Sequence, residues 1–283
     1  MGADPSTGRE AARKSVTPAP VESRRHSYPI AAYLLQIAHF LGPWVLVLAL
    51  WYGVRFSGFF EASLIPTPVE VVTRLWEMLI HGNLARDMYM STQRVFLGVA
   101  LGTACAVPVG FLLGWYKGLR SFMDPLINFF RALPPIALIP LVIVYFGIGE
   151  SAKIIILFYA AFFASVIVMY EGISQISPLY IRVAQTLGAT DAEIFRKVII
   201  PLAVPHALTA LRVALGVAWA TLVAAELVAA QHGLGAVIQD ASAYFQLDTI
   251  YMGIICIGFI ALTMDVALRR LTRRALRWQE RNE

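Results

Sequence analysis

Long apolar runs recur along the chain, and polar segments separate them. A helix needs about 20 apolar residues to cross the hydrocarbon core of a bilayer. Two runs, 31–53 and 95–116, contain no Asp, Glu, Lys or Arg and are long enough to cross it. Four further apolar stretches are shorter or contain prolines or isolated charges, at 132–149, 154–170, 207–230 and 249–268. The pattern therefore predicts six membrane-spanning helices.

The composition is typical of a membrane protein. Of the 283 residues, 58% are hydrophobic and 14% are charged, against about 45–50% and about 25% in soluble domains. The mean hydropathy is +0.67. A soluble globule of this size would expose too much apolar surface, so we expect an all-helical integral membrane domain with no room for a separate catalytic domain.

Basic residues are distributed unevenly between the two sides of the predicted spans. If the N-terminus lies inside, the inside segments hold 16 Lys and Arg residues and the outside segments hold five. This count omits Arg131 and Arg212, which lie at the ends of predicted spans. Basic residues concentrate on the cytoplasmic side of membranes, so we predict that both termini are cytoplasmic. The chain then divides into a tail over 1–29, a transmembrane domain over 30–268 and a basic tail over 269–283.

The largest outside segment spans 55–94 and contains an amphipathic stretch. After Pro66 and Pro68, the pattern over 69–80 predicts a short helix. Two interpretations of this helix stay open. In the first it has a function at the outer face, either as a cap or as a docking surface for a partner. In the second it packs as part of an ordinary loop.

Catalytic signatures are missing from the sequence. The five histidines are scattered, and neither an HExxH nor a GxSxG motif occurs. Residues 8–15 resemble a phosphate-binding P-loop, but such a loop needs a strand before it and a helix after it, which a proline-flanked tail does not supply. We therefore expect no enzyme activity, cofactor or metal. The net charge of +5 reports membrane topology rather than nucleic-acid binding.

The inside segment 177–205 predicts two short amphipathic helices. Gly188 offers a position where the chain can turn with positive φ after the first helix. Thr190 and Glu193 have the spacing of a capping box that starts the second helix, and we expect Pro201 to end it. The segment carries more apolar residues than an exposed connector needs, so it either packs at the membrane interface or forms a partner surface.

Five segments carry a resemblance to a known family. They occur in order at 131–140 (RALPPIALIP), 145–150 (YFGIGE), 181–189 (IRVAQTLGA), 215–226 (LGVAWATLVAAE) and 233–235 (GLG). Together they resemble the permeases of ABC importers in the nitrate/sulfonate/taurine family, most closely the taurine branch. One departure is that the general loop pattern begins Glu-Ala-Ala, whereas Arg182, Val183 and Ala184 stand here. A basic residue at this position favours taurine over nitrate.

The resemblance implies a type I ABC importer permease that works within a larger complex. In that family two permease subunits, here a homodimer, form the pore in the bacterial cytoplasmic membrane. Two ATPase subunits bind their inner face, and an extracytoplasmic binding protein delivers the substrate. The positions that would dock the ATPase are Ala184, Leu187, Gly188, Ala189, Phe195 and Pro201.

The substrate implied by the resemblance is a small sulfonate, with taurine first, moved inward by alternating access. The alternatives are a nitrate, alkanesulfonate or bicarbonate permease, or a stand-alone secondary transporter. Secondary transporters often contain two repeated halves with paired broken helices. No repeated half is visible in this sequence, which disfavours that last alternative.

Prolines and isolated charges mark candidate residues of the transport pathway. The prolines of the third predicted span free backbone groups, which lipid tolerates only against protein or water, so this span either lines the pathway or is a kinked packing helix. Arg131 and Arg212 either reach the membrane interface with their charged ends or face an anionic substrate. The pathway candidates are Pro134, Pro135, Pro140, Arg212, Trp219, Thr221 and Glu226.

Three further features have specific expected contacts. Glu226 lies late in the fifth span, where it could pair with Lys153, shape the outer gate or contact the ammonium of a zwitterion. Asp265 stands four residues before Arg269, which predicts a local ion pair. Glycines at a spacing of four residues in the second span predict close helix packing, at 98, 102, 110 and 114.

Overall fold

The computed structural model describes residues 30–59, 61–229 and 231–276, which fall into two units. The first unit, 1–53, contains most of helix α1 (Ile30–Phe56). This helix covers the first predicted span, but the apolar stretch Leu41–Phe56 within it is shorter than a span requires. The first of the six spans therefore stays a prediction. The predicted tail over 1–29, with its P-loop-like sequence, lies outside the described residues.

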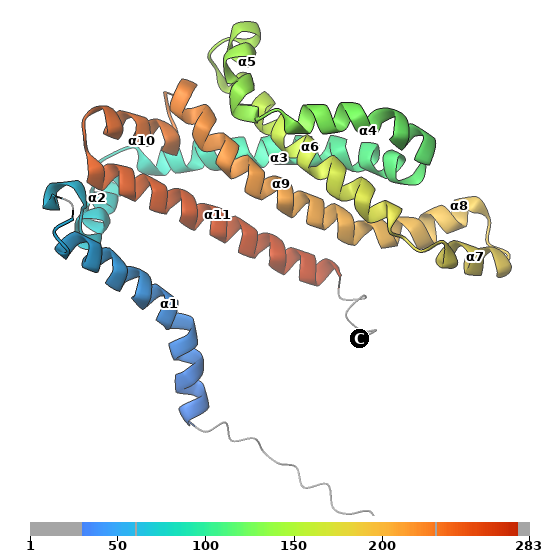
Figure 1. The fold of residues 1–283 in the computed structure, drawn as a ribbon, viewed down its shortest axis with the longest axis horizontal. Coiled ribbons are helices and arrows are strands. Elements are labelled where there is room, and N and C mark those ends of the chain that lie inside the picture. The colour runs from blue at the N-terminus through green and yellow to red at the C-terminus, as the bar shows by residue number, and fades with distance from the viewer. Residues whose placement is uncertain (1–29, 60, 230, 277–283) are drawn as a thin grey trace, which may run out of the picture. The chain divides into compact units, whose positions relative to one another are not determined.

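The second unit, 54–283, is helical throughout most of its described part (Figure 1). Helix α3 packs along α6, and α6 packs along α9. The helices are α2 (Pro68–Ile80), α3 (Leu84–Trp115), α4 (Lys117–Ala132), α5 (Ile139–Phe146), α6 (Glu150–Ser174), α7 (Pro178–Thr186), α8 (Asp191–Ile194), α9 (Ile200–Ala229), α10 (Leu234–Ala243) and α11 (Leu247–Ala275). Short 3-10 helices occupy Ala62–Leu64 and Pro135–Leu138, and a π-helical turn occupies Phe195–Ile199.

Four helical stretches in the described residues are long and apolar enough to cross a membrane. They are α3, α6, α11 and the continuous stretch Asp191–Val228. A fifth crossing is made only if α4 and the stretch Pro135–Phe146 count together, and these two are bent by 81°. The second, fourth, fifth and sixth predicted spans are thereby matched by long helices.

The third predicted span, 132–149, is not one continuous helix, and its crossing of the membrane stays a prediction. The helix stops at Ala132, and Leu133 and Pro134 are extended, with ψ values of 118° and 127°. The physical reason is the pair of consecutive prolines, because a proline disfavours helical geometry in the residue before it. Helix α5 then has eight residues, which is about 12 Å of rise and too short to cross the bilayer.

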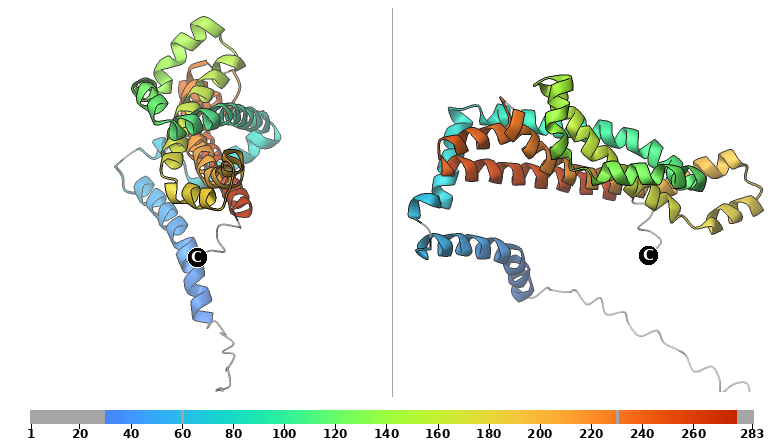
Figure 2. Two further views of the ribbon diagram at one scale, coloured as in Figure 1. Left: turned by 90° about the vertical axis from the view of Figure 1, so that its right-hand side faces the viewer. Right: turned by 45° about the horizontal axis from the view of Figure 1, so that its top comes forward.

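The two ends of the second unit carry different elements (Figure 2). Helices α2 and α10 lie at the end where α11 begins, and α7 and α8 extend beyond the long helices at the opposite end. The predicted helix over 69–80 is confirmed as α2, with Thr67 and Glu70 forming its capping box. Arg74 on α2 donates to Thr249 Oγ1 at 3.0 Å, so α2 packs against the start of α11.

Glycines hold α3 close to α6, as their spacing predicted. A Cβ at Gly102 would lie 2.7 Å from Ala161 Cβ, and one at Gly110 would lie 2.6 Å from Met169 Cβ. Gly98 and Gly114 likewise face α6 side chains. This contact continues into a core of buried residues where α3, α6 and α9 meet, formed by Val95, Val99, Leu157, Ala161, Ala214, Leu215, Ala218, Trp219 and Leu222.

We expect Gly102→Ala to lower the free energy of unfolding by about 1–3 kcal/mol, the usual cost of overpacking a core. The added methyl group would meet the α6 backbone as well as Ala161, because the Phe158 carbonyl oxygen lies 2.9 Å from its position. Thermal unfolding of the purified protein in detergent measures the change.

Gly258→Ala is the matched control for this prediction. Gly258 lies mid-helix in α11 with nothing within 4 Å of an added Cβ. Alanine is favoured over glycine in a helix interior by about 0.5–1 kcal/mol, so this variant should be as stable as the wild type or slightly more stable. Equal stability of the two variants would show that α3 and α6 are not closely packed.

Candidate functional site

Helices α7 and α8 form the bent pair that the sequence predicted over 177–205. Ser177 caps α7 by accepting a hydrogen bond from the Leu179 N–H. After α7 the chain turns at Gly188, whose φ is +79°. Thr190 and Glu193 then form the predicted capping box at the start of α8. Local signals in the sequence therefore fix the shape of this segment.

The bent pair and the π turn after it expose several large apolar side chains. Leu187, directly before the glycine turn, is 81% exposed. Phe195 is 44% exposed and makes an edge contact with the Phe111 ring, with 5.4 Å between ring centroids. Ala184 and Ala189 are half-buried beside them. The exposed large apolar residues of α7 are Leu179, Tyr180 and Val183. Exposed large apolar side chains gathered on one short segment are typical of an interaction site.

The expectation that Pro201 ends the second helix is wrong. Helix α8 continues through the π-helical turn Phe195–Ile199 into α9, and Pro201 is the second residue of α9. A proline inside a helix removes one main-chain hydrogen bond, and the helical hydrogen-bond pattern already changes in the π turn just before Pro201. The extra residue of a π turn also changes the helical register. The bent pair is therefore joined rigidly to a long apolar helix.

A buried ionic cluster occupies the opposite end of the bundle. Arg94 on α3 and Glu226 on α9 are 2% and 1% exposed, and Arg94 Nη1 lies 2.5 Å from Glu226 Oε1. Arg94 also donates through Nε and Nη2 to both oxygens of Glu150, at 2.6 and 2.7 Å. Lys153 reaches the same carboxylate at 3.0 Å. We call Asp87, Ser91, Arg94, Glu150, Lys153 and Glu226 the Arg94 cluster.

The expected pairing of Glu226 with Lys153 is wrong, because Arg94 takes that place. The sequence assigned Arg94 to the outside loop 55–94, yet α3 begins at Leu84 and buries it. Glu226 also accepts from Ser91 Oγ at 2.8 Å. Arg94, Ser91 and the Gly235 N–H all donate to Glu226, so contact of Glu226 with a substrate ammonium would require these hydrogen bonds to break.

The segment Gly233–Gly235 is bound to the Arg94 cluster by backbone N–H groups. The N–H groups of Gly233, Leu234 and Gly235 donate to Asp87 Oδ1, Ser91 Oγ and Glu226 Oε2 at 2.8–2.9 Å. These groups belong to the first turn of α10, where helical N–H groups lack partners. Gly233 has a φ of +126°, and an added Cβ would lie 2.6 Å from Arg94 Nη1. This explains the GLG sequence physically: glycine is required for the close approach.

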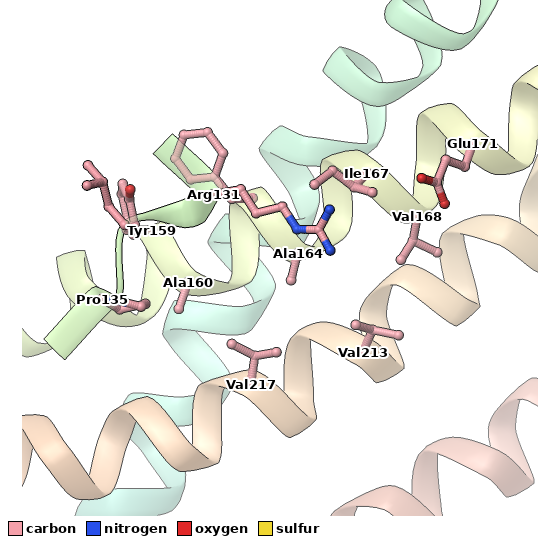
Figure 3. A pocket seen from close by; sticks show the side chains of 12 residues that line it. Arg131, Pro135, Tyr159, Ala160, Ala164, Ile167, Val168, Glu171, Val213 and Val217 are labelled. Atoms are coloured by element: carbon pink, nitrogen blue, oxygen red, sulfur yellow. The ribbon is translucent and has the colours of Figure 1, made fainter. Parts of the chain in front are cut away.

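A cavity of about 390 Å³ opens between α4, α6 and α9 (Figure 3). Most of its wall is apolar, with Ala160, Ala164, Ile167 and Val168 from α6 and with Val213 and Val217 from α9. Two charged side chains of opposite sign line it, Arg131 from the end of α4 and Glu171 from α6. In Figure 3 the Arg131 guanidinium extends into the cavity beside Ala164. We call this space the α6–α9 cavity.

Neither charge of the α6–α9 cavity is neutralised within the described part of the chain. Arg131 and Glu171 form no ion pair with each other or with any other described residue. Tyr159, another wall residue, donates its hydroxyl to the Phe130 carbonyl oxygen. Sequence reasoning had singled out Arg131 but not Glu171, whose place near the end of a span gave no signal of its own.

A second cavity of about 500 Å³ lies between α9 and α11. Arg212 Nε lies 2.9 Å from Asp265 Oδ1, and Arg269 Nε lies 2.6 Å from Asp265 Oδ2. The local Asp265–Arg269 pair is thereby confirmed. Arg212 has a carboxylate partner across two helices, an arrangement that the sequence did not predict.

The remaining pathway candidates are dispersed in the structure. Pro135 lines the α6–α9 cavity, Pro134 lies in the break after α4, and Pro140 is the second residue of α5. Trp219 is 5% exposed in the α3–α6–α9 core and lines the α9–α11 cavity. Thr221 is buried and donates to the Val217 carbonyl oxygen at 2.9 Å. The seven candidates do not form a single site. Only Pro135 among them lines the α6–α9 cavity, together with Arg131.

The profile of one protein family matches residues 106–277, from the middle of α3 to the end of α11. The family is described as the binding-protein-dependent transport system inner membrane component. The chain belongs to this family. Its members are transport components rather than enzymes, so the structure is that of an integral membrane permease of the ABC importers.

Two curated relatives and a solved structure agree with this membership. A "Probable ABC transporter permease protein" of Brucella abortus (strain 2308) is 46% identical over 231 residues, covering 82% of this chain and 91% of the relative. The "Taurine transport system permease protein TauC" of Escherichia coli (strain K12) is 34% identical over 248 residues, covering 86% and 90%. The MetNI methionine ABC transporter in an inward-facing conformation shares the fold, with a TM-score of 0.57, 22% identity and coverage of 68% and 95%. The resemblance and the type I fold inferred from the sequence are thereby confirmed.

Proposed function

We propose that this ABC importer permease moves taurine, a small sulfonate, inward by alternating access. The identity of 34% with a taurine transport permease supports this substrate. A nitrate, alkanesulfonate or bicarbonate importer is the alternative within the same class. A stand-alone secondary transporter is disfavoured, because the bent pair α7–α8 exposes apolar surface that such a protein would have no reason to keep.

The observation that carries the proposal is the exposed apolar surface at the glycine turn. Leu187 is 81% exposed at a bend that Gly188 imposes through its φ of +79°. A cleft in a partner ATPase would cover this leucine, together with Ala184, Ala189 and Phe195. Because α8 continues through a π turn into α9, movement of the bent pair would be transmitted directly to a wall of the α6–α9 cavity.

The proposed complex follows the organisation of the family. Two copies of this chain form the pore, two ATPase subunits bind α7 and α8, and an extracytoplasmic binding protein delivers the substrate. The uneven distribution of basic residues supports cytoplasmic termini, with a tail over 1–29, a transmembrane domain over 30–268 and a basic segment from 269 onward. Helix α11 continues into that basic segment as far as Ala275, where arginines can contact anionic lipid.

We expect Leu187→Glu to prevent co-purification of the ATPase while the permease still inserts and folds. Burying a charged carboxylate in an apolar cleft without a partner is strongly unfavourable, whereas the free permease exposes this position to solvent. The measurement is the ratio of ATPase to permease after affinity purification in detergent, with size-exclusion chromatography as the test of folding.

Leu187→Met is the matched control, because it keeps an apolar side chain of similar volume at the same position. This variant should recruit the ATPase as the wild type does. Equal recruitment by the glutamate and methionine variants would refute the docking of an ATPase at the glycine turn.

A further inference from the structure

We propose that the α6–α9 cavity is a binding site for a zwitterion, in which Arg131 binds the sulfonate group and Glu171 binds the ammonium group. The inference rests on the proposed import of taurine and adds which residues of this chain recognise it. It also assigns a role to Glu171.

The cavity has the size and lining of a small-molecule site. Its volume of about 390 Å³ falls within the range of about 300–1,000 Å³ that is typical of ligand pockets. Such pockets combine a mainly apolar wall with a few polar groups that fix the orientation of the ligand. Here Ala160, Ala164, Ile167 and Val168 supply the wall, and Arg131 and Glu171 supply the charges.

Several other arginines of the described helices have carboxylate partners. Arg94 is paired with Glu226 and Glu150, and Arg212 is paired with Asp265. Arg131 and Glu171 line a cavity without such partners among the described residues. A ligand that carries both opposite charges would satisfy both side chains of this cavity at once.

The pair also discriminates between classes of substrate. Arg131 alone would bind any small anion, nitrate or an alkanesulfonate included. Glu171 repels such anions and attracts an ammonium group, so only a zwitterion satisfies both side chains. Unfavourable contacts with the wrong ligand are an established source of specificity. Glu226 cannot fulfil this role, because Arg94 and Ser91 occupy its oxygens.

Cysteine protection tests the site without depending on transport. In a background of Cys105→Ser and Cys256→Ser, Ala164→Cys places a thiol in the cavity wall, and a water-soluble thiol reagent labels it in the permease–ATPase complex. Taurine should slow this labelling about tenfold at saturation, and ethanesulfonate, which lacks the amino group, should not. Gly216→Cys, in the α9–α11 cavity, should be labelled at the same rate with and without taurine.

Two charge variants then assign the roles of the side chains. Glu171→Gln should raise the taurine concentration for half-protection about tenfold and make taurine and ethanesulfonate protect equally. Arg131→Gln should remove the protection by taurine. Both side chains are exposed, so the variants should elute from size-exclusion chromatography as the wild type does.

Three results would overturn the inference. They are an absence of labelling at Ala164→Cys, labelling that taurine does not slow, and taurine protection that Glu171→Gln leaves unchanged. Taurine uptake by the complete transporter is measured in parallel. Uptake without protection would contradict this site alone, whereas a lack of taurine uptake would contradict the proposed function.

Discussion

Replacing Arg94 with methionine should destabilise the permease by about 3–5 kcal/mol, the usual cost of removing one partner of a buried ion pair. Glu226 would stay at 1% exposure with no cation beside it. Glu150 and the His232 carbonyl oxygen would also lose hydrogen bonds from the guanidinium group. Since the Arg94 cluster joins α3, α6, α9 and the start of α10, we expect most of the variant protein to be lost before purification.

The amount of monodisperse protein extracted in detergent and its unfolding temperature measure this effect. Arg86→Met is the control, because Arg86 is exposed on the same helix, two turns before Arg94. The double variant Arg94→Met/Glu226→Gln should recover part of the loss, since it removes the uncompensated charge. Equal unfolding temperatures for Arg94→Met and Arg86→Met would refute a structural role for the cluster.

Gly188→Pro should abolish ATP-driven uptake while leaving membrane insertion and the fold of the long helices intact. Gly188 has a φ of +79°, whereas a proline ring fixes φ near −65°. Proline would also remove the N–H that donates to the Gln185 carbonyl oxygen at 3.0 Å. The bend would open, and Leu187 and Ala189 would leave the positions from which they are proposed to contact the ATPase.

Gly188→Asn separates the effect of the turn from that of a new side chain. Asparagine adopts positive φ more readily than most residues, and nothing lies within 4 Å of an added Cβ at this position. This variant should retain most of the uptake in reconstituted liposomes. Uptake by Gly188→Pro at the rate of the asparagine variant would rule out the glycine turn as the point of coupling.

The bent pair α7–α8 could be predicted from the sequence because its determinants are local. A capping box at Thr190 and Glu193 and a glycine that allows positive φ each act within a few residues. The role of Pro201 could not be predicted in the same way. The helix continues past α8 through a π turn and on through Pro201 into α9.

The Arg94 cluster was missed because its contacts are distant in the sequence. Arg94 lies 132 residues before Glu226. The span was drawn to begin at Val95, since a charged residue was taken as the limit of the apolar run, whereas α3 begins at Leu84 and carries Asp87, Ser91 and Arg94 inward. The sequence did contain one signal for this cluster, the glycine pair Gly233 and Gly235. These glycines allow the backbone to approach Arg94 and Glu226 closely.

The α6–α9 cavity was only partly predictable. The prolines at 134 and 135 indicated an irregular third span, but an interruption does not specify the direction of the bend, which is 81° in the structure. Glu171 is unremarkable in the sequence because charges near the ends of spans usually face water. Its importance appears once α4 brings Arg131 to the same cavity.

The central claim is that this permease couples ATP hydrolysis in a partner to the import of taurine. The most direct measurement is the ATPase activity of the complete transporter in liposomes, with its binding protein loaded with taurine, nitrate or bicarbonate. The account predicts that the permease and ATPase co-purify and that the taurine-loaded binding protein stimulates hydrolysis while the other two ligands do not. Stimulation by nitrate or bicarbonate in place of taurine would contradict the substrate, and a permease that recruits no ATPase would contradict the mechanism.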